Sequence, residues 1–263
     1  FPEACNNLGS ALIMQGRLNE AAQYFRKALL MNPYYAEAYN NLGSVNQNQG
    51  KFRESIFCFR KALEIKADYI KAHSNLLYAM HYDPDSGSKL LYEEATHWWQ
   101  QHGLKKMPEF RHFAPSTKFR RIKIGYVSPD FREHSVSYFF LPLLRYHNRD
   151  SFEIFCYSEV KREDGITDQI KELSDHWRPI AWLRNRAIAD QVRQDGIDIL
   201  IDLAGHTAEN RLPVFAYKPP PVQITWLGYP GTTGMPVMDF RLTDEIADPP
   251  GEADEYHSET LVR

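Results

Sequence analysis

Three short segments of this sequence hold side chains whose types and spacing suit the binding of sugar or phosphate oxygens. The first segment (128–135) contains His134, and the second (204–207) contains His206 and Thr207. The third (228–234) consists of glycine, proline, threonine and tyrosine residues. Glycine allows a ligand to approach the backbone, and hydroxyl or N–H groups at helix starts hold such oxygens. No segment has the glycine spacing of a dinucleotide-binding fold or a P-loop, so neither kind of site is predicted.

Each of these segments directly follows a predicted β-strand. We expect strands at 121–127, 152–157, 197–203, 222–227 and 240–243, a short apolar run at 179–183, and helices at 137–146, 164–173, 187–194 and 210–217. This alternation predicts a mostly parallel sheet with helices on both faces, a Rossmann-like layer. Ligands bind beyond the carboxyl ends of parallel strands, so we expect the three segments to meet at one rim.

An internal repeat fills the first third of the chain. Asn-Leu-Gly-Ser at 7–10 recurs at 41–44, and Phe-Arg-Lys-Ala-Leu at 25–29 recurs at 59–63, both after 34 residues. A third, partial copy begins at Ala72. This period, with a helix, a glycine turn and a second helix, resembles the tetratricopeptide repeat and predicts an α-solenoid.

Asn7, Asn41 and Asn75 occupy equivalent positions on the first helix of each copy, just before a leucine that we expect to be buried. In such a solenoid these helices line the concave surface. An amide offers both a donor and an acceptor, which suits the clamping of an extended peptide backbone. The sequence equally allows each amide to bond a neighbouring helix instead. Because stacked copies stabilise one another, we expect further repeats before residue 1.

The pattern changes between 83 and 115 to a turn cluster, a helix-like stretch and a polar segment, which we interpret as a connector helix that caps the solenoid. Asp83 and Asp85 formally match the two-carboxylate motif with which some glycosyltransferases hold a divalent metal. They lie in a Pro/Gly/Ser turn, where Asp is common, so no metal site is predicted. The predicted domains are repeats at 1–82, a connector at 83–115 and a Rossmann-like lobe at 116–263.

Composition excludes several kinds of partner. The 263 residues carry 31 Lys+Arg and 34 Asp+Glu, a formal charge of −3, without a clustered basic stripe, so we expect no nucleic-acid partner. No apolar run approaches the roughly 20 residues that cross a bilayer, so no membrane association is expected. Cys5, Cys58 and Cys156 lie far apart, which predicts a reducing, cytoplasmic location without disulfides or a zinc cage.

Five segments of the predicted lobe resemble the amino-terminal catalytic lobe of O-GlcNAc transferases, and tetratricopeptide repeats that run directly into this lobe are that family's arrangement. The segments are 124–134, 152–157, 194–200, 226–234 and 239–244. The resemblance covers essentially the whole chain. Two further segments, 202–207 and 247–250, are more similar to bacterial or plant-type members, and the plant-type branch includes protein O-fucosyltransferases.

The resemblance implies a tetratricopeptide solenoid followed by one half of a two-lobed GT-B glycosyltransferase. The implied activity is the inverting, metal-independent transfer of GlcNAc from UDP-GlcNAc to Ser or Thr hydroxyls, with protein or peptide acceptors along the repeat groove and no cofactor beside the nucleotide-sugar. Two alternatives stay open. One is a plant-type protein O-fucosyltransferase that uses GDP-fucose, and the other is a non-catalytic adaptor that binds extended peptides.

The same resemblance implies roles for residues at the rim. It places His134 at a histidine considered for the catalytic base or for substrate positioning, and an unperturbed imidazole pKa of about 6.5 suits either role. The predicted substrate-binding residues are His206, Thr207, Leu227, Gly228, Tyr229, Pro230, Gly231 and Thr232. The alternative interpretation of the third segment is a tight turn that needs glycine and proline for its geometry only.

In such enzymes the nucleotide-sugar is held mainly by the carboxyl-terminal lobe, and residues 116–263 have the roughly 150 residues of a single lobe. We therefore expect a second lobe beyond residue 263. We predict that the 263-residue chain alone has no transferase activity and binds UDP-sugar weakly or not at all. Calorimetric titration with UDP measures this affinity, and a micromolar dissociation constant would contradict the prediction.

Overall fold

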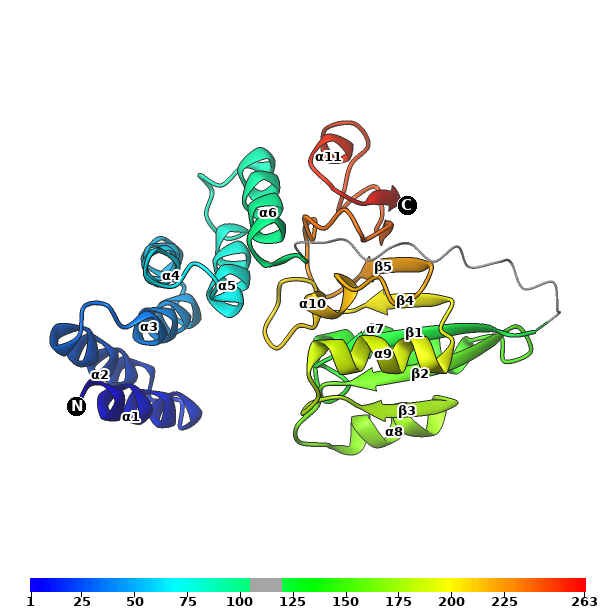
Figure 1. Cartoon of the computed structure of the whole chain (residues 1–263), viewed down its shortest axis with the longest axis horizontal. Coiled ribbons are helices and arrows are strands. Elements are labelled where there is room, and N and C mark those ends of the chain that lie inside the picture. The colour runs from blue at the N-terminus through cyan, green and yellow to red at the C-terminus, as the bar shows by residue number, and fades with distance from the viewer. Residues whose placement is uncertain (105–119) are drawn as a thin grey trace. The chain divides into compact units, whose positions relative to one another are not determined.

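The computed structural model of the chain describes residues 1–104 and 120–263, and it divides into two compact units, 1–102 and 103–263 (Figure 1). The end of the predicted connector, 105–115, lies outside the described residues, and the domain boundaries drawn from the sequence stay predictions. Within the described part of the chain, no helix has both the length and the apolar character that a bilayer span requires.

The helical unit, residues 1–102, consists of three helix pairs. The helices are α1 (Pro2–Met14), α2 (Leu18–Met31), α3 (Ala36–Asn48), α4 (Phe52–Ile65), α5 (Ile70–Met80) and α6 (Ser88–His102). Gly16 and Gly50 follow the first helix of two pairs with φ of +74° and +73°, as the predicted glycine turns require. The tetratricopeptide arrangement expected from the sequence is confirmed.

A close packing contact explains why a glycine and a phenylalanine recur together in the repeat. A Cβ at Gly43 would lie 2.7 Å from Cε1 of Phe59, and a Cβ at Gly9 would lie 2.6 Å from Cε1 of Phe25. Both phenylalanine side chains are fully buried. Since only a hydrogen fits at these two positions, the two helices of each pair pack closely and the ring fills the space between them.

One of the three leucines that were expected to be buried is not. Leu42 and Leu76 are 7% and 1% exposed, whereas Leu8 at the equivalent position is 44% exposed. Leu8 lies in α1, whose main contacts are with α2 and α3, whereas the equivalent helices α3 and α5 also contact a helix pair that precedes them. The leucine position therefore becomes buried only when another helix pair lies on its other side.

The α/β unit contains a seven-stranded, fully parallel sheet with the order β3-β2-β1-β4-β5-β6-β7. Its strands are β1 (Ile122–Ser128), β2 (Phe152–Ser158), β3 (His176–Pro179), β4 (Ile199–Asp202), β5 (Val222–Trp226), β6 (Phe240–Leu242) and β7 (Thr260–Val262). Its helices are α7 (Ser135–Tyr146), α8 (Gly165–Leu173), α9 (Asn185–Asp195), α10 (Leu212–Phe215) and α11 (Glu252–Glu255). The expected Rossmann-like lobe is confirmed.

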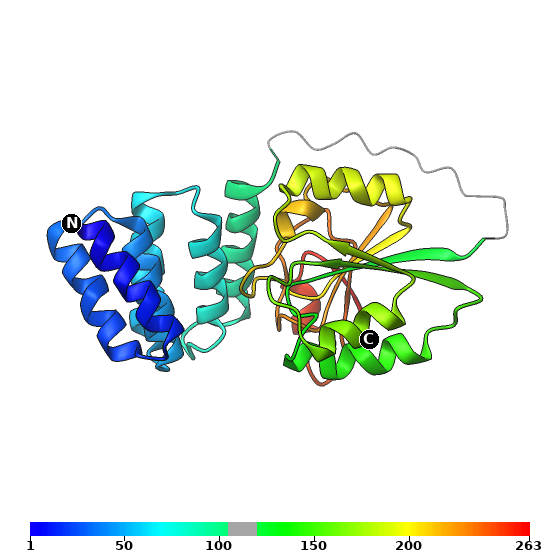
Figure 2. The same cartoon turned by 90° about the horizontal axis from the view of Figure 1, so that it is seen from below.

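Helices cover both faces of the sheet. Figure 2 shows α7 and α8, in green, on one face and α9, in yellow, on the other. Beneath α7, the ring of Phe140 stacks on Phe131 at 5.1 Å and meets Tyr126 edge-on at 4.8 Å between centroids. All three rings are nearly or fully buried, so this aromatic cluster fixes α7, and with it the loop after β1, on the sheet.

The structure differs from the expected elements in places. The short apolar run at 179–183 overlaps a strand only at Pro179, and the strand itself is β3, an edge strand whose single neighbour tolerates the residues His-Trp-Arg-Pro. The helix expected at 210–217 is the short α10. Residues 260–262 pair with β6 as a seventh strand, which overlaps the strand-like apolar run at 261–263.

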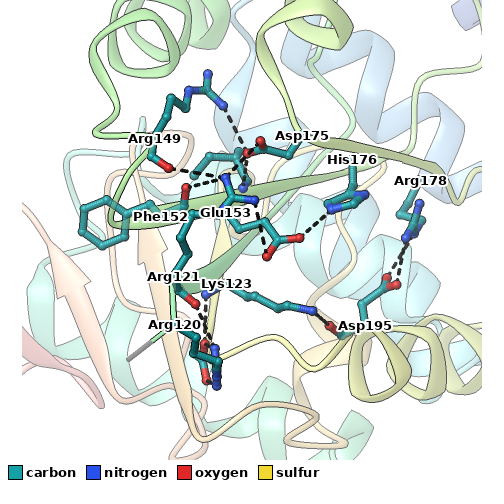
Figure 3. Close-up of polar contacts among 12 residues, drawn as sticks. Arg120, Arg121, Lys123, Arg149, Phe152, Glu153, Asp175, His176, Arg178 and Asp195 are labelled. Carbon is teal, nitrogen blue, oxygen red and sulfur yellow. Dashed lines mark hydrogen bonds and ion pairs between the residues drawn. The ribbon is translucent and has the colours of Figure 1, made fainter. Parts of the chain in front are cut away.

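A network of ion pairs joins β1, β2, β3 and α9 (Figure 3). Its most enclosed member is Asp195, which accepts two hydrogen bonds from Arg178, at 3.1 and 2.9 Å, and one from the hydroxyl of Tyr157 at 2.8 Å. Burial raises the pKa of the Asp195 carboxyl, but these hydrogen bonds outweigh burial and hold the pKa below its usual range. The ionised carboxylate therefore fastens the end of α9 to the sheet.

We predict that Asp195→Asn lowers the free energy of unfolding by about 1.5–3 kcal/mol at pH 7, since charge-assisted hydrogen bonds are lost. Because folding lowers the pKa, the stabilisation exists above the unfolded-state pKa of about 3.9 and is lost as the pH falls through the folded-state pKa. Urea unfolding at neutral and acid pH measures this. The difference between the two proteins should shrink in acid.

Asp190→Asn in the same helix is the matched control. Asp190 pairs with Arg193 at 2.8 Å, but its side chain is 50% exposed, so we expect a change within about 0.5 kcal/mol. Equal losses in the two variants, or a loss for Asp195→Asn that persists undiminished in acid, would contradict the proposed anchoring.

Candidate functional site

The three segments singled out from the sequence follow strands that lie side by side. Val127 of β1 is paired with Asp202 of β4, which in turn is paired with Thr225 of β5. The strand order reverses between β1 and β4, and ligands of open parallel sheets bind beyond the strand ends at such a point. The predicted convergence on one rim is confirmed.

His134 is the N-cap residue of α7. Its Nδ1 accepts a hydrogen bond from the backbone N–H of Val136 at 3.3 Å, and its Nε2 lies 3.7 Å from Oδ1 of Asp130. The side chain is 36% exposed, so a ligand can reach it. Because Nδ1 acts as an acceptor, the neutral ring carries its proton on Nε2 and offers an N–H donor at the rim.

Asp130 is a rim residue that the sequence reasoning did not select. Its side chain is largely buried, burial raises its pKa, and His134 and Arg132 oppose that rise. The surrounding loop is fixed by hydrogen bonds from the Asp130 N–H to Ser128 Oγ at 2.9 Å and from Ser137 Oγ to the Asp130 carbonyl at 2.8 Å. The signal in the sequence is the Asp-x-x-x-His spacing, which places a carboxyl beside the imidazole.

Asp202, at the end of β4, organises the second loop and was also missed. It is fully buried and accepts hydrogen bonds from the backbone N–H of Ala204 at 3.2 Å, from that of Gly205 at 2.7 Å and from Thr225 Oγ1 at 2.9 Å. Burial raises the pKa of Asp202 to about 6, opposed by these hydrogen bonds. One carboxyl thus ties the β4 loop to the neighbouring strand β5.

The third loop crosses directly over the second. Leu227 has a φ of +73°, and a Cβ at Gly228 would lie only 2.0 Å from the carbonyl oxygen of Leu203. A Cβ at Gly205 would similarly lie 2.3 Å from Cβ of Tyr229. Gly205 and Gly228 are therefore required by the close contact between the two loops, as the interpretation of the third segment as a tight turn expects.

His206 and Tyr229 form the wall behind this crossing. Their rings meet edge-on at 5.2 Å, and they are 0% and 3% exposed. Nε2 of His206 lies 2.9 Å from the carbonyl of Thr233, and the carbonyl of Tyr229 accepts from Arg241 at 2.9 Å. Burial raises the pKa of the Tyr229 hydroxyl. Both side chains support the loop from inside.

The predicted hydroxyl ligands are engaged within the protein. Thr207 Oγ1 donates to the carbonyl of Ala204 at 2.9 Å, and Thr232 Oγ1 donates to Glu259 at 2.6 Å. Glu259 is 5% exposed and also accepts from the N–H of Thr233 at 2.7 Å. Of the predicted substrate-binding residues, Leu227, Gly228, Pro230 and Gly231 have exposed or partly exposed surface. Their role in binding stays a prediction.

The asparagines of the repeats form contacts between helices. Asn41 Nδ2 donates to Asn6 Oδ1 and Asn75 Nδ2 donates to Asn40 Oδ1, both at 2.9 Å. Asn7 is exposed. The neighbouring-helix contact left open by the sequence is thus present, and it uses one N–H of each amide. Peptide binding by these side chains stays a prediction.

The two aspartates of the turn after α5 face a cation of the protein itself. Arg53 Nη2 lies 2.6 Å from Asp85 Oδ2, and its Nε lies 3.6 Å from Asp83 Oδ1. Ser86 Oγ also donates to Asp83 at 3.1 Å. These contacts support the interpretation of the segment as a turn.

Two profiles of known protein families match this chain. A tetratricopeptide repeat profile matches residues 3–68, and the profile of glycosyl transferase family 41 matches residues 70–262, most of the chain. The chain belongs to glycosyl transferase family 41. The family 41 match begins with α5 and includes all three loops of the rim.

Curated proteins and a solved structure are also similar to this chain. The probable UDP-N-acetylglucosamine–peptide N-acetylglucosaminyltransferase SPINDLY of Oryza sativa is 39% identical over 192 residues, 71% of this chain and 20% of that protein. The similarly described SEC of Arabidopsis thaliana is 39% identical over 145 residues, 55% of this chain and 15% of that protein. A solved Thermobaculum terrenum O-GlcNAc transferase mutant is 37% identical, with a TM-score of 0.91 over 100% of this chain and 50% of its own. The family 41 chain thus spans about a fifth of the length of these curated relatives.

We predict that Gly228→Ala destabilises the α/β unit by at least about 2 kcal/mol, because the new methyl group would overlap the Leu203 carbonyl and push the two loops apart. Urea unfolding measures the change. Gly165→Ala is the matched control, since a Cβ there meets nothing within 4 Å, and it should be neutral or slightly stabilising. Unchanged stability of Gly228→Ala would show that the loops do not press together.

Proposed function

We propose that this family 41 protein transfers N-acetylglucosamine from UDP-GlcNAc to Ser or Thr hydroxyls of other proteins, with inversion and without a catalytic metal. The observation that carries the proposal is the family 41 match over residues 70–262, which includes a rim where three loops converge at the reversal of strand order. Support also comes from the printed descriptions of SPINDLY and SEC as probable UDP-GlcNAc–peptide transferases. We propose a cytoplasmic location on the grounds of its cysteine usage.

In the proposed reaction the acceptor oxygen attacks the anomeric carbon of GlcNAc on the face opposite UDP. The bond from this carbon to the protein oxygen forms as the bond to the diphosphate oxygen breaks, and UDP departs with the electron pair of that bond. The hydroxyl proton passes from the acceptor oxygen to solvent water as the new bond forms, so the step balances without a base from the protein. Such a displacement depends mainly on positioning the two substrates and stabilising the leaving group.

His134 fits the positioning role better than the role of base. Its Nδ1 accepts the N–H of Val136, so the neutral ring presents a proton, not a lone pair, at Nε2. In the proposal this N–H donates to a substrate oxygen at the rim. Asp130, whose Oδ1 lies 3.7 Å from Nε2, supports the orientation of the ring.

The remaining rim residues divide into surface and support. Leu227, Gly228, Pro230 and Gly231 supply the accessible surface that we propose contacts the sugar. The buried residues His206, Tyr229 and Thr232 hold this loop in place from behind, and the partly buried Thr207 bonds the second loop to itself at Ala204. Rigid support of this kind preorganises a site, so that substrate binding does not have to order the loop.

For the acceptor, we propose binding of an extended peptide along Asn7, Asn41 and Asn75. Each amide has two N–H donors and one carbonyl acceptor. Asn41 and Asn75 each use one N–H for the neighbouring helix. The bonds between helices therefore orient the amides while other polar groups on each side chain face the peptide backbone.

We predict that His134→Ala in the full-length protein lowers kcat/KM at least about 100-fold, the lower limit for a positioned proton-transfer or donor group. His134→Gln, which keeps an N–H donor but no base, should retain part of the activity. Mass spectrometry of an acceptor protein incubated with UDP-GlcNAc measures transfer. His176→Gln, far from the rim on β3, is the matched control and should be fully active.

The results of these assays distinguish the possible roles of His134 and the possible sugar donors. Complete loss of activity in both His134 variants would assign His134 as a base instead, because glutamine keeps an N–H donor but cannot accept the proton. Unchanged turnover in His134→Ala would remove it from the mechanism. Modification with GDP-fucose alone would establish the plant-type alternative, and no modification with either donor would favour the peptide-binding adaptor.

A further inference from the structure

A cluster of three imidazoles and a carboxylate lies in the helical unit, apart from the rim. His73 comes from α5, and Glu94, His97 and His102 come from α6. His73 Nε2 lies 2.8 Å from Glu94 Oε1, and His97 Nδ1 lies 3.5 Å from the same oxygen. Glu94 and His97 lie three positions apart on α6, and His102 follows about two turns after Glu94, and all three side chains reach His73 of α5.

We propose that His73 Nε2, Glu94 Oε1 and His97 Nδ1 bind a divalent transition metal of the zinc class. The three atoms all lie within 4.8 Å of one another. Zinc bonds of about 2.0–2.2 Å in tetrahedral geometry place ligand atoms about 3.3 Å apart, close to what the cluster presents. Two imidazoles and one carboxylate form a known zinc ligand set, with water in the fourth position.

The residues in contact with the cluster, His102 and Gln101, can also adapt to a metal. His102 Nε2 lies 2.9 Å from His73 Nδ1, so His73 can donate its Nδ1–H to His102 and turn the lone pair of Nε2 toward the metal. The side-chain amide of Gln101 lies 3.4 Å from Nε2 of His97, the nitrogen that faces away from the cluster. The nearer amide atom is Nε2, which donates, so a metal-bound His97 with its proton on Nε2 requires the Gln101 amide to turn so that Oε1 accepts that N–H.

Burial gives the cluster an inner and an outer side. His73 is 1% exposed, Glu94 19% and His97 54% by side chain. A metal can therefore enter from the side of His97 and replace the direct contact between His73 Nε2 and Glu94 Oε1. The ligand positions do not belong to the repeat pattern, because the equivalents of His73 in the other two copies are Tyr39 and Cys5.

The metal would fasten the last helix of the unit to the last repeat. The cluster joins α5 to α6, and its members interlock, since the rings of His97 and His102 both meet His73 edge-on, at 5.3 and 5.1 Å between centroids. A bond through a metal adds a directional link at this point. The sequence predicted no metal site, and it did not reveal this cluster because 20 residues separate His73 from Glu94.

The test is metal binding by the 263-residue chain after chelation and dialysis. Titration with Co²⁺ followed by visible absorption, and with Zn²⁺ followed by calorimetry, should give one tightly bound ion per chain with the intense bands of low-coordinate cobalt. Zinc should also raise the midpoint of thermal unfolding. Removing His102, an outer partner, should weaken binding about 10–100-fold, and His97→Gln or Glu94→Gln should weaken it more than that.

The matched control is His176→Gln. His176 also pairs with a carboxylate, Glu153, at 2.7 Å, but the pair belongs to no three-ligand group among the described residues. This variant should bind metal as the unaltered chain does. His97 is half exposed, so its replacement should leave the fold intact by circular dichroism, and Glu94→Gln provides a second test.

Failure to bind either ion, or binding that His97→Gln and Glu94→Gln leave unchanged, would overturn the proposal. The first result would mean that the cluster is a hydrogen-bonded group without a metal. The second would mean that the ion sits elsewhere on the chain. Because the readouts are binding and unfolding, neither result depends on transferase activity.

Discussion

Two buried carboxylates hold the rim of the parallel sheet together. Asp202 accepts from two backbone N–H groups of its own loop and from Thr225 on the next strand, and Glu259 accepts from Thr232 and Thr233. They are 0% and 5% exposed. Burying a carboxyl group is costly unless hydrogen bonds compensate, so any movement of these loops would leave that cost uncompensated. The rim is therefore rigid before a substrate arrives, which a displacement reaction controlled by positioning requires.

The sequence predicted the rim because strand periodicity and chain order suffice to place strand ends on one edge. It did not predict which side chains face a ligand there. Thr232 and Glu259 are 27 residues apart, and their contact depends on the register of β7, too short a strand to recognise. The same limit applies to His206, whose ring turns inward to Thr233. Hydroxyl and imidazole groups in a loop are thus ambiguous until the register of the strands is known.

The repeats were easier to predict, because each copy contains the same packing contact between its two helices. The pairing of Gly43 with Phe59 recurs in the preceding copy as Gly9 with Phe25, so a periodic sequence reports a periodic contact. What lies outside the period was harder to see. The cluster of His73 with Glu94 occurs once, between a repeat helix and the helix that follows it, and no internal comparison marks it. Two of the repeat asparagines, Asn41 and Asn75, form contacts between helices, and their proposed role in peptide binding stays a prediction.

The central claim is that the accessible part of the third loop and the imidazole of His134 contact the transferred sugar and its acceptor. The most direct test is a crystal structure of the full-length protein with an unreactive UDP-GlcNAc analogue and an acceptor peptide. We predict electron density for the sugar in contact with residues 227–231, and a substrate oxygen about 3 Å from Nε2 of His134. Density for the sugar away from this rim, with His134 facing solvent or protein only, would contradict it.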